Sequence, residues 1–439
     1  MGRLEVTDAL TRARTYPHAV LAYVGPDGYP VNIAVDFTES VDTAEVQIGP
    51  LDPDLRPTDG QEVELTFSHI RPQPGVGYDE RRYVNLWGRA TPAGSGLRVA
   101  VGRASGWDEA DTPFFEYAER SVPAGRGYLD ELGARPRLSR LWTIFLATRL
   151  PFLTATLIPV GLGGVIAARD NAFHALWFVV ALVAAMAVHL GLNMANDLFD
   201  DASGADAANV TPTPFSGGSR VLQYGLVSRR AMVTGCVALY ALSMALGVYL
   251  AVERGWALLA IGAVGIVLSL AYSAPPLRLV HRGLGEPVTA LGFGPVMAVG
   301  TYFASAGRWS WQPVLASLPV ALLIALVLYV NQVPDRLGDE AAGKRTLIVR
   351  LSPAQVQTVY ATGVGAAFVC IVAEVVSGVT PAWTLLALAT LPLAWRVWRG
   401  LRAHYGEPYA LMPTMQSNIV LHLLTGLLLV IGYVISVVS

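Results

Sequence analysis

The stretch Asn193-Met-Ala-Asn-Asp-Leu-Phe-Asp-Asp201 decides how the rest of this chain is interpreted, because it places acidic and amide side chains at the end of a long apolar run. On a helix, Asn193, Asn196, Asp197 and Asp200 fall at i, i+3, i+4 and i+7 and therefore share one face. Ionisable groups are costly in a lipid environment, so a polar face on an otherwise apolar helix predicts a functional site.

A second polar cluster ends another apolar run, residues 313–334, with the sequence Asn331-Gln-Val-Pro-Asp-Arg-Leu-Gly-Asp339. Asn331, Asp335 and Asp339 would form a second polar face on a helix that continues past Pro334. Carboxylate and amide oxygens suit Mg²⁺, which takes one or two carboxylates and shares substrate phosphates. Two facing clusters therefore predict paired magnesium sites that hold a diphosphate.

The spacing of these acids resembles the two aspartate motifs of the UbiA superfamily of intramembrane prenyltransferases. The chain contains Asn196-Asp197-x-x-Asp200-x-x-x-Gly204-x-Asp206 and, much later, Asp335-x-x-x-Asp339. The general pattern has an acid where this chain has Gly204, and Asp206 is taken as the substitute because the quinone-type branch of the superfamily shows a similar Gly-x-Asp.

Three further stretches are similar to the branch that contains the 1,4-dihydroxy-2-naphthoate prenyltransferases of menaquinone synthesis: Tyr272-Ser-Ala-Pro-Pro-Leu-Arg278, Gly283-Leu-Gly-Glu286 and Ala341-Ala-Gly-Lys-Arg-Thr-Leu347. The resemblance covers roughly residues 140–438. It implies an all-α membrane bundle of about nine helices. It also implies Mg²⁺-dependent transfer of a prenyl group from an allylic diphosphate to an aromatic, quinone-precursor-like acceptor.

Roles follow for individual residues from this resemblance and from the chemistry. The predicted metal ligands are Asn193, Asn196, Asp197, Asp200, Asp206, Asn331, Asp335 and Asp339. The predicted diphosphate contacts are Arg149, Arg220, Tyr272, Arg278 and Lys344. For Arg149 and Arg220 a charge at the membrane surface is an equally open interpretation, and Tyr272 and Arg278 fit an interfacial position equally well. The predicted catalytic set is Asp197, Asp200, Asp335, Asp339 and Lys344.

Two other functions remain open from the sequence. Some members of the superfamily cyclise the isoprenoid without an acceptor, and such a terpene cyclase would carry the same acids. A secondary transporter is a second alternative, but transporters place ionisable residues near the middle of the membrane and on broken helices. The acids of this chain instead crowd the ends of apolar runs.

The composition is that of a membrane protein attached to a soluble part. Of the 439 residues, 53% are hydrophobic and 15% are charged, and the mean hydropathy is +0.46. A nucleic-acid partner is not expected, whereas contact with membrane lipid is expected. Apolar runs long enough to span a bilayer lie near residues 141–168, 173–198, 229–252, 256–274, 286–306, 313–334, 354–377, 381–399 and 416–437.

Arginine and lysine predict the orientation of these spans, because they gather on the cytoplasmic side of membrane proteins. Alternate connections are rich in them, and this set is Arg135, Arg137, Arg140, Arg220, Arg229, Arg278, Arg282, Arg336, Lys344, Arg345, Arg396 and Arg402. The opposite connections hold little beyond Arg169, Arg254 and Arg308. The beginning Met1-Gly-Arg-Leu-Glu-Val-Thr-Asp lacks the apolar segment of a signal peptide. Both acid clusters and the N-terminal region are therefore expected on the cytoplasmic side.

The N-terminal region has the alternating pattern of β-strands from Ala19 to about Arg89, with Gly25-Pro-Asp-Gly28 as a turn signal. A small antiparallel barrel is expected, similar to split barrels of the pyridoxamine-phosphate-oxidase type. Such barrels often bind flavin, and Arg71, Arg81 and Arg82 are candidate contacts, but solvated loop charges are the favoured interpretation. The predicted division is a barrel at 1–130, a linker at 131–140 and a membrane domain at 141–439. The stretch from Gly125 to Pro136 has the glycine and proline content of a linker.

Overall fold

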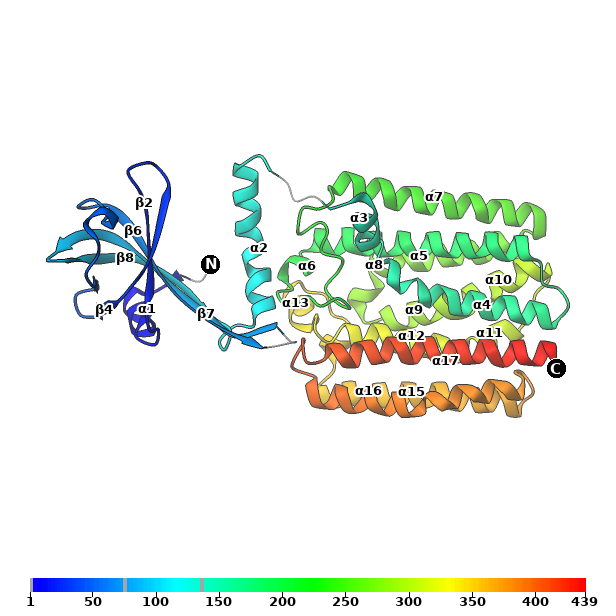
Figure 1. Ribbon diagram of the computed structural model, residues 1–439. Coiled ribbons are helices and arrows are strands. Elements are labelled where there is room, and N and C mark those ends of the chain that lie inside the picture. The colour runs from blue at the N-terminus through cyan, green and yellow to red at the C-terminus, as the bar shows by residue number, and fades with distance from the viewer. Residues whose placement is uncertain (1–2, 74–76, 135–137) are drawn as a thin grey trace. The chain divides into compact units, whose positions relative to one another are not determined.

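The computed structural model describes residues 3–73, 77–134 and 138–439. The chain forms two compact units, Met1–Tyr128 and Leu129–Ser439 (Figure 1). The predicted cations Arg135 and Arg137 lie outside the described residues.

The first unit is built on one antiparallel sheet, as the alternating sequence predicts. Its strands are β1 (Arg3–Leu4), β2 (Ala19–Val24), β3 (Pro30–Val35), β4 (Phe37–Ser40), β5 (Glu45–Ile48), β6 (Glu62–Gln73), β7 (Gly77–Ala93) and β8 (Gly96–Asp108). The pairing order is β3-β2-β6-β7-β8-β5-β4, and β1 pairs with β8. Only Asp36 separates the two edge strands, so the sheet curls until its edges meet, in the manner of a partly open barrel.

The interior of this curled sheet is filled by inward-facing residues of alternate positions, among them Leu21, Leu65 and Leu86, which are completely buried. Helix α1 (Val6–Ala13) closes one end and buries Leu10 against them. A short 3₁₀ turn, η1 (Pro53–Leu55), follows β5. The expected β region is confirmed, whereas the specific similarity to pyridoxamine-phosphate-oxidase barrels stays a prediction.

The glycine-containing stretch from Gly125, expected as part of the linker, begins as helix. Helix α2 (Phe114–Glu131) runs through Gly125 and Gly127 and tolerates Pro123. Glycine and proline are only weak local signals, and helix propensity is readily overridden by context.

The second unit consists of helices. They are α3 (Arg140–Ala147), η2 (Leu150–Leu153), α4 (Thr154–Arg169), α5 (Ala175–Ser203), α6 (Ala205–Ala208), α7 (Arg229–Arg254), α8 (Ala257–Ser273), η3 (Leu279–Arg282), α9 (Gly285–Leu291), the π-helical η4 (Gly292–Val296), α10 (Met297–Ala306), α11 (Gln312–Ala316), α12 (Leu318–Asn331), α13 (Arg336–Ala341), α14 (Leu347–Arg350), α15 (Pro353–Val376), η5 (Ala382–Thr390), α16 (Leu391–His404) and α17 (Met412–Val438).

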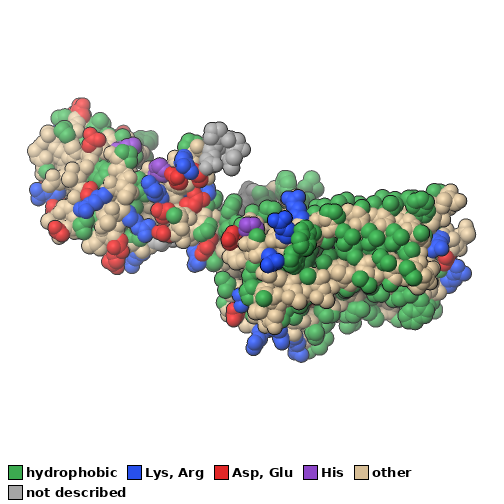
Figure 2. Space-filling model, turned by 90° about the horizontal axis from the view of Figure 1, so that it is seen from below, with side chains coloured by type: hydrophobic (Ala, Val, Ile, Leu, Met, Phe, Trp, Pro, Cys, Tyr) green, Lys and Arg blue, Asp and Glu red, His purple; other side chains and the backbone are tan. Residues whose placement is uncertain are grey.

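Among the described residues, seven helical segments are long and apolar enough to cross a membrane: Leu150–Arg169, Ala175–Ser203, Arg229–Arg254, Gly285–Ala306, Gln312–Asn331, Pro353–Val376 and Met412–Val438. The two remaining predicted runs are also helical, but α8 is shorter and η5–α16 is partly 3₁₀ and ends in an amphipathic helix. The expected count of nine is thus approximate. Figure 2 shows the broad apolar side of this unit, with charged side chains gathered at its two ends.

The second acid cluster does not lie on one continuous helix, contrary to the expectation for a helix past Pro334. Helix α12 ends at Asn331, the chain turns through residues 332–335, and α13 begins at Arg336. Proline has no N–H and therefore interrupts the hydrogen-bond ladder of a helix. Asn331 is consequently separated from the turn that carries Asp335 and Asp339, where the Asp339 amide donates to the Asp335 carbonyl at 2.8 Å.

Helices α4 and α10 approach each other closely at a glycine. A Cβ atom on Gly163 would lie 2.4 Å from the backbone oxygen of Ala298, whereas a Cβ on Gly161 would meet nothing nearer than a Val430 methyl at 3.7 Å. A backbone atom cannot move aside as a side chain can, so the α4–α10 contact requires glycine at position 163.

Gly163→Ala is expected to lower the free energy of unfolding by about 1–3 kcal/mol, the usual cost of forcing extra volume into a packed interior. Gly161→Ala is the matched control on the same helix, and it should be neutral or slightly stabilising because alanine is the better helix former. Thermal unfolding of both purified variants in detergent measures the difference. Equal melting temperatures for the two variants would contradict this account of the contact.

Candidate active site

The first acid cluster lies at the end of α5, where all four predicted polar residues are on one helix. Asp197 is 2% exposed. Its Oδ1 accepts a hydrogen bond from Arg149 Nη2 at 2.7 Å, and its Oδ2 accepts one from the Ser219 amide at 3.2 Å and another from the Ser219 hydroxyl. One turn on, Asp200 Oδ2 accepts from Lys344 Nζ at 3.0 Å and from Asn196 Nδ2 at 3.1 Å. Cations and donors from other segments thus surround the carboxylates.

A glycine turn brings Asp206 back beside the same cluster. Gly204 ends α5 in the left-handed conformation, with φ +79°, which suits glycine and reverses the chain into α6. Asp206 is buried there, and a Cβ on Gly218 would lie 2.7 Å from its Oδ2. Gly218 itself has φ +76°. Both glycines are therefore needed for this loop to fold over the acids.

The loop after α6 joins the two acid clusters. Asn209 Nδ2 donates to Asp335 Oδ1 at 2.7 Å, and the Gly217 amide donates to Asp335 Oδ2 at 3.1 Å. The loop contains Phe215-Ser-Gly-Gly-Ser219, and glycine lets backbone amides approach an anion closely. In the structure, the anions that these amides contact are the carboxylates of Asp335 and Asp197.

Lys344 connects the clusters directly. Its ammonium lies 3.0 Å from Asp200 Oδ2 and 3.5 Å from Asp339 Oδ1, so it bridges α5 and α13. Burial acts against its charge, but Asp200 and Asp339 outweigh this effect and hold the pKa of Lys344 well above its ordinary value. The only lysine of the chain therefore stays charged between the two predicted metal sites.

The acids of the cluster are not fully compensated by its cations, and two of the carboxyl pKa values are raised. Burial raises the pKa of Asp206 to about 9, and the nearby charges of Asp200 and Asp197 add to this effect. Burial likewise raises the pKa of Asp339 to about 7, partly offset by Lys344. Such shifts mean that each additional negative charge is unfavourable here without further cations.

The remaining predicted contacts lie at varying distances from this centre. Arg220 is buried and donates to the backbone carbonyls of Asp206 and Asn209. Asn193 donates to the Thr148 carbonyl at 3.0 Å. Arg278 is exposed on the turn after α8, with φ +42°.

Asn331 and Tyr272, two of the predicted site residues, lie where a bound ligand could contact them. Asn331 is buried, and its Oδ1 lacks a hydrogen-bond partner among the described residues. Tyr272 lies close enough to Asp200, Lys344 and Arg149 for electrostatic interaction. Their assigned roles stay predictions.

Sequence reasoning did not identify three polar residues of the site: Asn209, Ser219 and His281. His281 Nε2 lies 4.0 Å from Asp200 Oδ1, and burial lowers the pKa of this imidazole. Ser219 follows two glycines that mark a close-packed loop, which is a usable signal. Asn209 and His281 have no comparable local pattern, because they reach the acids through tertiary folding alone.

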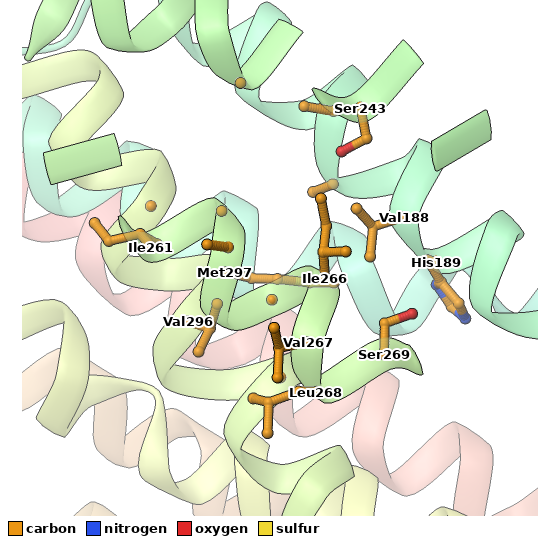
Figure 3. Close-up of a pocket in the computed structure, with 18 of the residues that line it drawn as sticks. Val188, His189, Ser243, Ile261, Ile266, Val267, Leu268, Ser269, Val296 and Met297 are labelled. Carbon is orange, nitrogen blue, oxygen red and sulfur yellow. The ribbon is translucent and has the colours of Figure 1, made fainter. Parts of the chain in front are cut away.

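An apolar cavity of about 470 Å³ borders this polar centre. Its wall comes from α5, α7, α8, α9, η4 and α10, and Figure 3 shows Val188, Ile266, Val267 and Met297 among the lining residues. Tyr272 lines one part of it and is also an electrostatic neighbour of the charged cluster. The cavity therefore lies next to the acids, and its size is that of a small-molecule site.

His189 also lines this cavity, one α5 turn below Asn193. Its Nδ1 lies 2.8 Å from the Thr156 hydroxyl, and its ring meets Phe293 edge-on at 4.6 Å. His189 is thus a buried, hydrogen-bonded histidine.

The carboxylate and amide oxygens of the site suit hard cations such as Mg²⁺, which prefer oxygen ligands. In the described part of the chain, no group of three His, Cys, Asp or Glu side chains is placed to hold one metal ion alone. Mg²⁺ does not require such a group, because it usually keeps waters and shares phosphate oxygens. Asp200 Oδ1 is buried and without a hydrogen-bond partner among the described residues. The site thus retains an oxygen that an additional ligand or cation can satisfy.

Comparisons with known proteins identify the family of this chain. Residues 156–435 match the model of the UbiA prenyltransferase family. A 2-carboxy-1,4-naphthoquinone phytyltransferase from Synechocystis is 27% identical over 299 residues, which cover 68% of this chain and 94% of that protein. A 1,4-dihydroxy-2-naphthoate octaprenyltransferase from Bacillus subtilis is 25% identical over 296 residues, covering 67% and 92%.

Among solved structures, a UbiA homolog from Archaeoglobus fulgidus bound to DMAPP and Mg²⁺ is 16% identical and superposes with a TM-score of 0.46. It covers 65% of this chain and 98% of that one. The family match spans well over half of the chain and includes both acid clusters and the cavity. On this basis the chain belongs to the UbiA prenyltransferase family.

Proposed function

We propose that this protein transfers a prenyl group from an allylic prenyl diphosphate to an aromatic acceptor related to the quinone precursors. The observation that carries the proposal is the pairing of two acid clusters, joined by Lys344, with an apolar cavity at their side. One region suits a diphosphate and its cations, and the other suits an isoprenoid chain. The naphthoate and naphthoquinone substrates in the names of the relatives support an aromatic acceptor.

Asp197, Asp200, Asp206, Asp335 and Asp339 are proposed to hold Mg²⁺ together with the diphosphate, and the amides Asn193, Asn196 and Asn331 to complete or orient this set. Bound Mg²⁺ would supply electrostatic stabilisation of the negative charge that develops on the departing diphosphate. Lys344 and Arg149 are the cations of this chain that are best placed to share that charge, because both already contact carboxylates of the site.

Charge neutralisation allows the allylic C–O bond to break, with its electron pair leaving on the diphosphate. The apolar cavity then excludes water, which would otherwise capture the allylic cation. A ring carbon of the acceptor supplies the electron pair for the new C–C bond. Loss of a proton or of carbon dioxide from that carbon restores aromaticity.

Cyclisation of the isoprenoid without an acceptor is the second candidate, since it would use the same acids and cavity. The names of the relatives favour transfer. A transport function has less support, because the acids lie at the ends of α5 and α13 rather than near the middle of a span. A flavin at the first unit is not favoured, since Arg71 pairs with Asp79 and Arg81 pairs with Glu109.

Substitution of Asp197 by asparagine is expected to lower the rate of diphosphate release on the order of 10²–10³-fold, as removal of a group that stabilises developing charge does. Asp201→Asn is the matched control on the same helix, because Asp201 faces Arg229 at 2.7 Å instead of the cluster. The release of diphosphate from prenyl diphosphate and acceptor, with Mg²⁺ or with excess chelator, is the measurement. Equal losses in the two variants, or full activity in chelator, would contradict the metal site.

The acceptor requirement separates transfer from cyclisation. Product carrying the prenyl group should form only when prenyl diphosphate and a phenolic or naphthoic acid are both present, and diphosphate release should be slow without the acceptor. Mass spectrometry of products from a panel of both substrates tests this. A cyclic hydrocarbon or terpene alcohol formed at full rate from prenyl diphosphate and Mg²⁺ alone would establish the cyclase.

The orientation is proposed from the positive charges at the end that holds the acids. A cysteine introduced at the half-buried Ser203, where α5 ends, is expected to react with membrane-impermeant maleimide only after cells are opened. An equivalent cysteine at Arg308, in the connection between α10 and α11, is the control and should react from outside intact cells. The reverse labelling pattern would place the acid clusters and the first unit on the outer side.

A further inference from the structure

One side of α16 carries three arginines and two tryptophans that the proposed chemistry does not use. Arg396, Arg399 and Arg402 are exposed. Trp395 is 59% exposed, and its ring centre lies 4.7 Å from that of Trp398. We refer to these five residues as the α16 arginine face.

The helix repeat places these side chains together. Ala394, Val397 and Leu401 are the buried residues of α16, and they belong to the core shared with α15 and α17. At about 100° per residue, Trp395 and the three arginines fall on the remaining side and are exposed. Trp398 lies at the edge of this side and packs partly against the core, so the other four residues are the ones that point outward from the bundle.

The arginines of this face have no internal counter-charge. In the described part of the chain, no carboxylate lies within 4.0 Å of Arg396, Arg399 or Arg402. Six residues of helix correspond to about 9 Å of axis, which is comparable with the screening length at physiological salt. The three charges consequently repel one another unless an anion lies between them.

The tryptophans add an apolar surface beside the charges. The Arg402 guanidinium carbon lies 4.7 Å above the Trp398 ring, which restrains this side chain. Leu391, one turn before Trp395, is 47% exposed and continues the surface towards the middle of the span. Indole rings concentrate at the level of lipid headgroups. The face thus offers cations at the helix end and apolar contacts below them.

Figure 2 views the unit from the side where Figure 1 draws α15 and α16. It shows blue side chains at both ends of the unit, with an extended green surface between them. A ligand with an anionic head and an apolar body matches this combination. A soluble anion would use the guanidinium groups but would leave the indoles and Leu391 without a role.

We propose that the α16 arginine face is a binding site for the headgroup of an anionic phospholipid. Guanidinium groups bind phosphate oxygens through paired N–H donors, and the acyl chains lie along Trp395 and Leu391. This site is independent of the prenyl-transfer chemistry, because none of its residues contacts the acid clusters.

The test compares lipid binding by full-length protein and by the triple variant Arg396→Gln, Arg399→Gln and Arg402→Gln. Native mass spectrometry of protein in detergent, titrated with phosphatidylglycerol or phosphatidylcholine, gives the two affinities. The unsubstituted protein should bind phosphatidylglycerol more tightly. Each arginine removed should weaken that binding about fivefold, or on the order of 10²-fold for all three.

The control variant is Arg230→Gln, Arg282→Gln and Arg350→Gln, which removes the same charge from scattered exposed positions on α7, η3 and α14 at the same end. It should retain the preference for phosphatidylglycerol. The single variant Arg399→Gln gives a second measure should the triple variant unfold in detergent. Inorganic phosphate in excess should not displace the lipid.

Three results would overturn the proposal. Equal affinity of the unsubstituted protein for the two lipids would remove the anionic preference. Equal loss in the control variant would show a diffuse charge effect instead of a site. Displacement of phosphatidylglycerol by inorganic phosphate would assign the face to a soluble anion.

Discussion

The contact between Lys344 and two aspartates is the interaction on which the site depends. Asp200 and Lys344 are 144 positions apart in the sequence, and Asp339 is held by the same ammonium. Buried carboxylates repel one another strongly in a low-dielectric interior, so α5 and α13 can lie together only with cations between them. Lys344 supplies one such charge permanently, and Arg149 supplies another on Asp197.

The same electrostatic constraint explains why the loop between α6 and α7 directs its hydrogen-bond donors at the acids. Its amides and the Asn209 side chain donate to the carboxylates of Asp335 and Asp197. These hydrogen bonds compensate part of the cost of taking carboxylates out of water. The loop is therefore part of the charge balance of the site and not merely a connection between spans.

The local pattern of the sequence was enough to bring the acids together on paper, because the helical repeat and the aspartate spacings are visible within a few residues; their roles stay predictions. The face of α5 and the β region of the first unit are examples. The expected continuation of a helix past Pro334 was wrong: a proline signals an interruption, but the tertiary fold decides whether the helix resumes. Asn209 and His281 could not be found, since their contacts join segments that are distant in the chain. Arg220 could be located near the site, but nothing local indicates that it would donate to backbone carbonyls.

The interruption before α13 has a mechanical consequence. Asp197 and Asp200 belong to a helix of 29 residues that is packed into the bundle, and their positions are stiff. Asp339 belongs to a six-residue helix and Asp335 immediately precedes it, with turns on both sides, so the positions of these two carboxylates do not depend on the hydrogen bonds of α12. Mg²⁺ tolerates little deviation from octahedral geometry. One pair of carboxylates lies on a long helix and the other beside a short one. This arrangement allows the separation between the two pairs to adapt to the ion and to diphosphates that carry tails of different size.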